Sequence, residues 1–364
     1  MKNKVLVVTH WFYPLNVPRA FRATELSKQL IKDGYEVDVV NLNRKKLIKM
    51  NDFGAINDCE TKSTSRLKSK YFSKLNSIFE FFLGERFYFI NKSFFSKIDI
   101  NNYDIVISIG LPFYVHRLVA SSIKKYNWKG IAIADWSDPY YKSHVKLARY
   151  FKYIQKQVIS KFDYIVIPIE DVKDYYLEYS TEEKIKIIPQ GFNFETVRLK
   201  TYKRKKKVTF GYGGIFYKDI RNPEDILDYL SKIELDFSFY IYTLKKGVVY
   251  EDVLLKYKKI MGEKLIINDI VDREKLIYEL SGMDFVFNIE NTTRNQTPSK
   301  LIDYALTQRP IISLPTVIDD EGKEKLMNFF KGDYEKQTVI DLKRYDIVEV
   351  TEKFISLFGE KHEY

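Results

Sequence analysis

Strand-length runs of apolar, often β-branched residues alternate with helical patterns along most of this chain, and the alternation starts twice. The first series comprises residues 4–10, 36–42, 103–110, 130–135, 164–169 and 184–189. The second comprises residues 208–212, 237–243, 264–270, 284–290 and 310–314. Strands that are apolar on both faces and separated by helices are typical of a doubly wound parallel sheet. We therefore predict an α/β protein with two Rossmann-like domains.

The length of 364 residues also suits about two domains. We expect a first domain over residues 1–200 and a second over 201–345, joined near the charged stretch TYKRKKK. The last segment, 346–364, contains a helical pattern with one apolar face and can pack back on the first domain. Ligands of such sheets bind at the carboxyl ends of the strands, so two facing domains would direct their loops into a central cleft.

Composition excludes several classes of protein. The sequence has no run of about 18 uncharged apolar residues and no signal-peptide core at its start, so we expect a cytoplasmic protein. Cys59 is the only cysteine, which excludes an intrachain disulfide and a cysteine-based zinc site. No His, Asp and Glu cluster has metal-ligand spacing, so no metal is predicted.

The net charge of +11 is concentrated in the first half. Residues 1–200 contain 33 Lys and Arg against 21 Asp and Glu, whereas the remainder contains 27 against 28. Within the first half, residues 61–98 carry eight Lys and Arg, two acids, eight Phe and two Tyr. Bases beside aromatic rings favour an interfacial helix on an anionic membrane. The alternative is two helices that pack their Phe side chains in the core of the first domain.

Two arginines open the helix that follows the first strand. Arg19 and Arg22 lie where the free N–H groups of the helix would face the cleft, and both can bind an acceptor there. The alternative is that both are solvated surface arginines. The loop lacks the Gly-x-Gly-x-x-Gly fingerprint, so no nicotinamide or flavin cofactor is predicted.

Two further candidates follow strands of the first domain. In ADWSDPYY, residues 134–141, Asp138 can bind a sugar hydroxyl or act as a base, or it can simply cap the next helix. His116, in GLPFYVHRLVA, lies one turn into a helix that begins after a strand. A single histidine is more often structural than functional.

The second domain carries a glycine-rich loop after its first strand. In FGYGGIFYKDIRNPEDIL, Gly213 and Gly214 let the backbone approach a bulky anion, and Lys218 and Arg221 can neutralise a diphosphate. The stretch is not a Walker A loop, because the Gly-Lys-Ser/Thr ending is missing.

A polar helix start, NQTPSKLID, supplies more donors. Pro298 suits a first helical turn, so the free N–H groups of Ser299 and Lys300 can hold a phosphate, with Thr297 nearby. Asp303 lies one turn further along the same face and can accept the hydroxyls of a ribose. The alternative is a capped helix with a solvated Lys300.

In this order, the motifs resemble the GT-B glycosyltransferases, and most closely the large retaining family 4 that builds bacterial surface polysaccharides. The resemblance covers nearly the whole chain, from VLVVTHWFYPLNVPRAFRATELSKQLIKDGYEVDVV to NQTPSKLIDYALTQRPII. YDIVISIGLPFYVHRLVASSI followed by IAIADWSDPYY is similar to the D-x-x-D-P segment of one branch. IKIIPQGFN, residues 185–193, matches the strand that closes the first domain.

The family signature is a glutamate, seven residues and a second glutamate. Asp303 occupies the second position, which in the family holds the donor ribose, and Asn295 stands eight residues earlier in place of the first glutamate. The usual carboxylate near the donor sugar is thus absent.

Other donor contacts are also implied by the resemblance. Lys218 or Arg221, together with Lys300, would bind the diphosphate, and backbone near Ile270 and Val271 would hold the base of a UDP- or GDP-type donor. The donor is a substrate, and no cofactor is implied.

The resemblance implies a metal-independent, hexosyltransferase-type enzyme that transfers sugar with retention. Lys218, Arg221 and Lys300 would stabilise charge on the leaving diphosphate, while Asp138 or His116 would orient the acceptor. The expected acceptor is a lipid-linked glycan of capsule, O-antigen or exopolysaccharide type at the inner face of the cytoplasmic membrane.

Two other classes stay open. A sugar-nucleotide epimerase of the same fold would use the same donor site without an acceptor. Nucleic-acid binding would explain the positive charge, but the sequence contains no recognised module for it and spreads the bases over an α/β domain. The sequence does not predict an oligomeric state.

Overall fold

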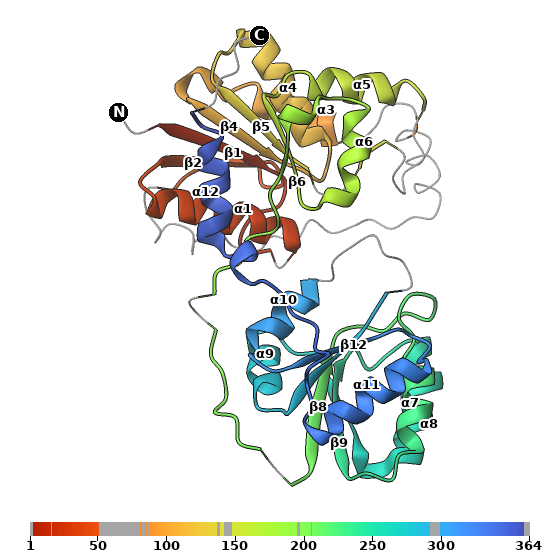
Figure 1. Ribbon diagram of the computed structural model, residues 1–364. Coiled ribbons are helices and arrows are strands. Elements are labelled where there is room, and N and C mark those ends of the chain that lie inside the picture. Colours follow the sequence, from red (N-terminus) through yellow and green to blue (C-terminus); the bar gives the residue numbers. More distant parts are fainter. Residues whose placement is uncertain are drawn as a thin grey trace. The chain divides into compact units, whose positions relative to one another are not determined.

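The computed structural model describes residues 3–15, 17–50, 81, 85, 87–136, 139–141, 148–194, 197–204, 206–291 and 299–359. The chain folds into two compact units, one formed by Met1–Asn193 together with Arg344–Tyr364 and the other by Phe194–Lys343 (Figure 1). These divisions lie close to the limits expected at residues 200 and 345. Each unit has its own sheet and its own hydrophobic core.

The first unit is built on a sheet with strand order β3-β2-β1-β4-β5-β6-β7. Its strands are β1 (Lys4–Thr9), β2 (Glu36–Asn41), β3 (Lys46–Lys49), β4 (Ile105–Ile109), β5 (Ile131–Asp135), β6 (Tyr164–Ile167) and β7 (Ile185–Ile187). Its helices are α1 (Pro18–Lys32), α3 (Phe87–Phe95), α4 (Tyr114–Tyr126), α5 (Phe151–Ile159), α6 (Lys173–Leu177) and α12 (Ile347–Ser356). Short 3-10 helices span Ile100–Asn102, Glu170–Val172, Glu182–Lys184 and, in the segment that connects the two units, Lys343–Tyr345.

The pairing of these strands is parallel apart from one edge. β3 pairs with β2 in antiparallel register, and the turn between them contains Lys45 with a φ of 50°. The sequence prediction missed this strand, because KLIK is short and flanked by lysines. Lysines on an edge strand discourage pairing with a second sheet. The predicted parallel strands of this unit are confirmed to within about two residues.

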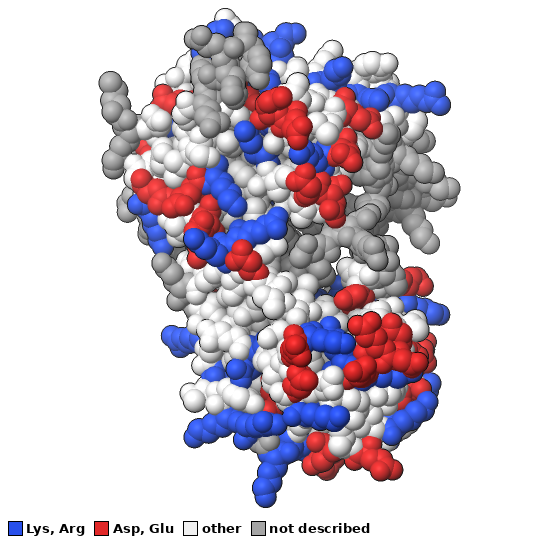
Figure 2. Space-filling view, in the orientation of Figure 1, with Lys and Arg blue, Asp and Glu red and all other residues white. Residues whose placement is uncertain are grey.

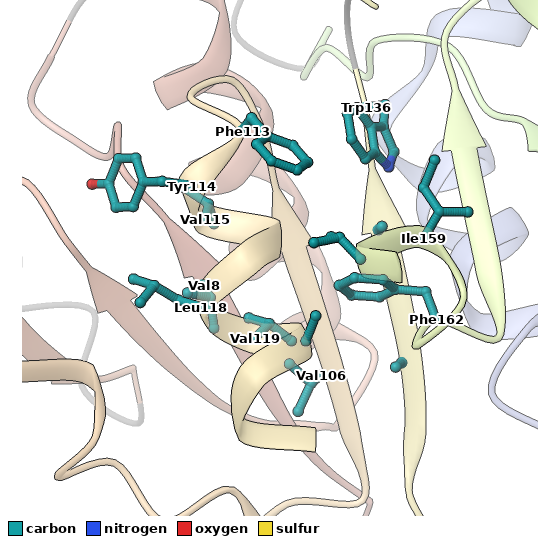
Figure 3. Packing of buried hydrophobic residues seen from close by; sticks show 14 of the residues in the cluster. Val8, Val106, Phe113, Tyr114, Val115, Leu118, Val119, Trp136, Ile159 and Phe162 are labelled. Carbon is teal, nitrogen blue, oxygen red and sulfur yellow. The ribbon is translucent and has the colours of Figure 1, made fainter. Parts of the chain in front are cut away.

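The core of the first unit fills the layers on both faces of this sheet. In Figure 3, Leu118 and Val119 of α4 lie on Val8 and Val106 of the sheet, within one continuous buried cluster. A second cluster on the other face joins strand side chains to α1 and to α12. Because both faces are covered, the strands read as continuous apolar runs rather than alternating ones.

The second unit has a fully parallel sheet with strand order β10-β9-β8-β11-β12. Its strands are β8 (Val208–Gly213), β9 (Phe237–Thr243), β10 (Leu265–Asp269), β11 (Phe285–Ile289) and β12 (Ile311–Leu314). Its helices are α7 (Glu224–Ser231), α8 (Leu255–Met261), α9 (Arg273–Ser281), α10 (Ser299–Leu306) and α11 (Asp320–Lys331), with a π-helical turn at Val249–Leu254 and a 3-10 turn at Gly262–Lys264. All five strands were predicted from the sequence.

The helices of the second unit cover its sheet from two sides. α7, α8 and α11 lie on one face, and α9 and α10 lie on the other (Figure 1). Because every strand runs in the same direction, the loops after β8, β9, β10, β11 and β12 share one edge. This edge is where ligands of doubly wound sheets bind.

Arg22 and Asp135 form a buried ion pair that connects several elements of the first unit. Arg22 Nε donates to Asp135 Oδ2 and Nη2 donates to Asp135 Oδ1 at 2.9 Å, and both side chains are almost fully buried. The guanidinium also donates to the carbonyls of Pro189 and Ile188 and lies over the Phe354 ring of α12. The prediction that Arg22 binds an acceptor is therefore wrong for this conformation, because its donors are used internally.

Loss of the arginine should destabilise the first unit. We expect Arg22→Met to lower the free energy of unfolding by about 3–5 kcal/mol, because it leaves the Asp135 carboxylate buried without its partner. Trp11, Trp128 and Trp136 are the three tryptophans of the chain and all lie in the first unit, so tryptophan fluorescence during urea unfolding measures this loss. Arg22→Met combined with Asp135→Leu should cost less than Arg22→Met alone. Equal costs would contradict this account of the pair.

Candidate functional site

Two of the first-unit candidates that the structure describes, Arg22 and His116, are buried in the interior of that unit. His116 is fully buried, with Nδ1 placed 2.7 Å from Ser108 Oγ and its ring stacked on Trp136. Burial is the main cause that lowers the pKa of His116 to about 3, and the charge of Arg19 lowers it further. The structure thus argues against the predicted contact between His116 and an acceptor, because a fully buried neutral ring belongs to the core.

Gly110 explains why this histidine packs so closely against the end of β4. A Cβ on Gly110 would lie 2.3 Å from His116 Nε2, so only glycine fits at this strand end. Arg19 lies in the first turn of α1 and is half-buried. Of the first-unit candidates that the structure describes, it is the one with a partly accessible side chain. Asp138 lies outside the described residues.

In the second unit, Gly213 joins the end of β8 to α10. The Tyr304 hydroxyl accepts a hydrogen bond from Gly213 N and donates one to Gly213 O, both at 3.0 Å. Tyr304 is fully buried, so this double contact fixes the glycine loop against the helix. A Cβ on Gly213 would meet the Leu276 side chain at 2.4 Å, which explains the glycine.

Gly214 is the point where the backbone passes Lys300. Its φ is +135°, a conformation that L side chains rarely adopt, and an added Cβ would lie 2.0 Å from Lys300 Nζ. The ammonium group therefore occupies the space that any side chain at residue 214 would take. The predicted combination of a glycine loop and a lysine at a helix start is present at this strand end.

Lys300 and Arg221 share the Tyr212 hydroxyl. Lys300 Nζ donates to Tyr212 Oη at 2.9 Å, and Arg221 Nη1 approaches the same oxygen at 3.5 Å. Within the described residues, neither cation forms an ion pair with a carboxylate. Burial is the main cause that lowers the pKa of Lys300 to about 7; Arg221 lowers it further, whereas Asp303 raises it. Two cations held together without a carboxylate in direct contact favour an anion.

Asn291 holds the Arg221 side chain in place. Its Oδ1 accepts from Arg221 Nε at 3.0 Å and from Nη2 at 2.6 Å, and the carbonyl of Ile215 accepts from Nη1. Asn291 is a neutral partner, so the arginine keeps its full positive charge for a ligand. The loop after β8 and the segment after β11 are thus hydrogen-bonded to each other at one edge of the sheet.

Lys218 lies in the same loop but faces different surroundings. Its exposed side chain lines a cavity of about 490 Å³ beside α7 and Tyr257 of α8, and Arg221 also lines this cavity. The wall of this cavity carries four carboxylates, those of Asp219, Glu224, Asp225 and Asp228. Carboxylates disfavour a diphosphate, so the glycine loop with Lys300 is the better anion site than the cavity.

Asp303 lies one turn beyond Lys300 in α10 and is mostly buried. Arg273, the first residue of α9, donates from Nε to Asp303 Oδ1 at 2.6 Å. Burial raises the pKa of the Asp303 carboxyl, and the arginine opposes that shift. Within the described residues, Asp303 Oδ2 makes no hydrogen bond, so this oxygen can still accept one from a ligand.

The remaining donor candidates follow β10 or lie outside the described chain. Ile270 is about half exposed and Val271 is half-buried, directly after the carboxyl end of the strand. Contact of their backbone with the base of a donor stays a prediction. Ser299 begins α10, but its side chain is not described, and Asn295 and Thr297 lie outside the described residues.

Sequence reasoning missed the neutral partners that hold these charged groups. Tyr212 directly precedes Gly213, the last residue of β8; Tyr304 follows Asp303, and Asn291 lies after β11. A polar aromatic residue directly before Gly213 was the available signal for Tyr212. Nothing in the sequence pairs Arg273 with Asp303, because the two residues are 30 positions apart and meet only when α9 packs on α10.

Comparison with solved structures identifies the architecture. The chain is similar to the lipopolysaccharide outer core galactosyltransferase WaaB, with a TM-score of 0.58, 12% identity and coverage of 97% of this chain and 98% of that one. It is also similar to an α-glucosyltransferase in complex with UDP and DNA, with a TM-score of 0.53, 10% identity and coverage of 98% and 96%. The chain has the GT-B fold.

The chain is also similar to S. aureus MnaA with UDP, with a TM-score of 0.51, 12% identity and coverage of 100% of this chain and 99% of that one. No protein-family model matches the sequence, and no curated protein matches it. At these identities the likeness establishes the fold alone, and the chemistry has to be argued from this chain's own residues.

The desolvated Lys300 gives a stability test that needs no ligand. Its pKa of about 7 in the folded chain lies below the ordinary value of 10.5, so below about pH 7 the folded state holds a charge that the unfolded state hydrates better. This penalty disappears as the pH rises toward 10.5. We expect Lys300→Met to stabilise the second unit at pH 6.5 by a net amount of about 1–3 kcal/mol, once the lost hydrogen bond to Tyr212 has been subtracted. The gain should be smaller at pH 9.5.

Scanning calorimetry at the two pH values measures this effect. Lys275 is exposed, so Lys275→Met is the matched control. It should not stabilise the protein more at pH 6.5 than at pH 9.5. A lower melting temperature for Lys300→Met at pH 6.5 would show that the charge is stabilised by its surroundings, contrary to our reading of the site.

Proposed function

We propose that this protein is a glycosyltransferase that moves a sugar from a nucleotide-diphosphate sugar to an acceptor. The observation that carries the proposal is the pair of cations, Lys300 and Arg221, on the Tyr212 hydroxyl beside the glycine loop. An uncompensated pair at the carboxyl edge of a parallel sheet suits the diphosphate of the donor. UDP is present in the solved structures of two GT-B proteins to which the chain is similar.

In the proposed reaction, the glycosidic bond to the diphosphate breaks while the acceptor hydroxyl approaches from the same face of the sugar. The leaving phosphate oxygen takes the hydroxyl proton, and Lys300, Arg221 and the N-terminus of α10 stabilise the negative charge that develops. Transfer with retention, a hexose as the transferred sugar, and independence of metal all stay predictions. Among the described residues, no group of three His, Cys, Asp or Glu is arranged to hold a metal ion.

We further propose a family 4-like role in bacterial capsule, O-antigen or exopolysaccharide synthesis, with a lipid-linked glycan as the acceptor. The named activity of WaaB, a lipopolysaccharide outer core galactosyltransferase, supports a role of this kind. Nucleic-acid binding gains no support from the face of the molecule that Figure 2 shows. On the face seen in Figure 2, the described basic and acidic side chains are intermixed and form no single basic stripe.

Nucleotide binding tests the donor site directly. We expect UDP or GDP at 100 times its dissociation constant to stabilise the protein by about 2.7 kcal/mol in a thermal-shift assay. Affinity should fall as the pH rises through about 7, because Lys300 loses the proton that pairs with the diphosphate. Calorimetry in two buffers of different ionisation enthalpy should show proton uptake on binding near pH 7.5. If no nucleotide stabilises the protein, the donor site is misassigned.

Two glycine variants separate the anion site from general strain. Gly214→Ala should weaken nucleotide binding at least about tenfold, because its methyl group displaces the Lys300 ammonium. Gly247→Ala is the matched control, since Gly247 has a φ of +95° but nothing within 4 Å of an added Cβ. Incubation with nucleotide sugar alone distinguishes the transferase from the epimerase alternative, because only an epimerase converts the donor without an acceptor.

The exposed face of α3 supports the proposal that the first unit binds a membrane surface. Phe89 and Ile90 are each about half exposed, Lys92 lies beside them, and Lys124 and Lys125 lie on α4, which packs on α3. Apolar side chains flanked by lysines suit an anionic lipid surface. None of the described helices is both long and apolar enough to span a membrane. Most of the segment predicted for this contact, residues 61–80, 82–84 and 86, lies outside the described residues.

Vesicle sedimentation tests this surface. Ile90→Ser combined with Lys92→Gln should reduce binding to vesicles containing phosphatidylglycerol by about tenfold, because it removes an inserted side chain and a charge worth about 1 kcal/mol. Tyr153→Ser combined with Lys152→Gln changes an exposed aromatic residue and a lysine on α5 and should leave binding unchanged. Equal binding by all three proteins would exclude attachment through α3.

A further inference from the structure

His10 directly follows β1, at the edge of the first sheet where doubly wound folds bind ligands. Its Nδ1 lies 2.5 Å from the hydroxyl of Tyr114, the first residue of α4, which follows the neighbouring strand β4. Within the described residues, Nε2 makes no hydrogen bond, yet it is not one of the fully enclosed polar atoms that lack a partner. Nε2 therefore reaches the molecular surface, although the residue as a whole is only 3% exposed.

Asn91 of α3 determines which group donates in the contact between His10 and Tyr114. Its Nδ2 lies 2.9 Å from the carbonyl oxygen of Phe87, which can only accept, so this side of the amide is the nitrogen. The same Nδ2 donates its second hydrogen to Tyr114 Oη at 3.3 Å. Among the described residues, His10 Nδ1 is then the acceptor for the hydrogen of the buried Tyr114 hydroxyl.

This chain of hydrogen bonds fixes the tautomer of His10. An imidazole nitrogen that accepts a hydrogen bond carries no proton, so the neutral ring has its proton on Nε2. Burial lowers the pKa of His10 to about 4, which keeps the ring neutral at pH 7. Burial, together with the charge of Glu85, raises the pKa of Tyr114, so the hydroxyl keeps its hydrogen. His10 consequently presents an N–H donor at the edge of the sheet.

The other histidine that the structure describes is arranged differently. His116 Nε2 is enclosed without a partner beside Gly110, and the ring is stacked on Trp136. In Figure 3, Tyr114 and Trp136 lie on opposite sides of the start of α4. The two histidines therefore occupy different surroundings, and only the nitrogen of His10 reaches the surface.

An aromatic ring lies beside the His10 donor. Trp11 is half-buried, and its ring meets the His10 ring edge-on with a centroid distance of 4.2 Å. The Thr9 hydroxyl donates to the carbonyl of Trp11 at 3.0 Å and so fixes the turn after β1. A sugar presents apolar C–H groups next to hydroxyls, so an aromatic ring beside a single neutral N–H donor suits a sugar.

We propose that His10 binds the acceptor by donating its Nε2 hydrogen to a hydroxyl oxygen of a sugar, with Tyr114 and Asn91 as positioning residues that hold the tautomer. The inference rests on the proposed glycosyltransferase function and adds a residue of the first unit that contacts the acceptor. Because Nε2 carries the proton, His10 does not act as the base for the attacking hydroxyl. The contact orients the acceptor, and the hydroxyl proton passes to the leaving phosphate.

The tautomer can be measured without a ligand. Long-range ¹H–¹⁵N correlation spectra at neutral pH should show a protonated Nε2 and an unprotonated Nδ1 for His10. Tyr114→Phe removes the hydroxyl and should admit the other tautomer. Tyr88→Phe is the matched control, because it removes the hydroxyl that joins α3 to Ser121 of α4 and should leave the His10 signals unchanged. A proton on Nδ1 in the wild-type protein overturns the inference.

Titration with methyl glycosides of glucose, galactose and N-acetylglucosamine, in the presence of UDP or GDP, tests the contact itself. Tryptophan fluorescence follows binding in every variant, because Trp11 is half-buried whereas Trp128 and Trp136 are buried. We expect at least one glycoside to shift the His10 Nε2 signal, and His10→Phe to weaken its binding about tenfold. His10→Gln keeps an N–H donor near the same place and should recover most of the affinity.

The two His10 variants separate a ligand contact from a structural role. A structural role would give His10→Phe and His10→Gln the same affinity for the glycoside, and this result overturns the inference while the donor site stands. The inference also falls if the wild-type protein binds a nucleotide but no glycoside of this panel. A wild-type protein that binds neither UDP nor GDP overturns the proposed function, and the acceptor role of His10 falls with it.

Discussion

β8 lies in the middle of the second sheet and is hydrogen-bonded in parallel to β9 on one side and to β11 on the other. This pairing fixes where the strand ends, and Gly213 at its end is held to α10 by both hydrogen bonds of the Tyr304 hydroxyl. The start of α10, the loop that carries Arg221 and the end of β11 with Asn291 consequently meet at one edge. The candidate site depends on this arrangement, because none of its charged side chains is adjacent to another in the sequence.

The two units bury cations in different ways. Arg22 is neutralised by Asp135 and by two carbonyls, so its charge serves the fold of the first unit. Lys300 is half-buried against a neutral hydroxyl and beside a second cation, an arrangement that lowers its pKa and destabilises the folded chain at neutral pH. Such a cost is retained where a ligand supplies the missing negative charge. The contrast supports the proposal that the ligand binds in the second unit, and this support does not depend on any related protein.

The sequence predicted the strands and the glycine loop because both follow from local patterns. Apolar runs give β8 and β9, and Gly214 is required by a φ of +135° and by the Lys300 side chain. The prediction from the sequence failed where the direction of a side chain depends on packing. Arg22 and His116 lie near strand ends, as predicted, but they point into the first unit, toward Asp135 and Ser108. Arg273 could not be found at all, since its role depends on α9 meeting α10.

The internal use of these residues constrains how the first unit can bind an acceptor. The charges of Arg22 and Asp135 cancel each other in the core, and the buried ring of His116 is held neutral beside Ser108. If the first unit binds the acceptor as proposed, the partly accessible Arg19 is the described candidate that could contact it, whereas Arg22, Asp135 and His116 are used internally. This agrees with a reaction in which the leaving diphosphate takes the hydroxyl proton, because such a transfer requires the first unit only to position the acceptor.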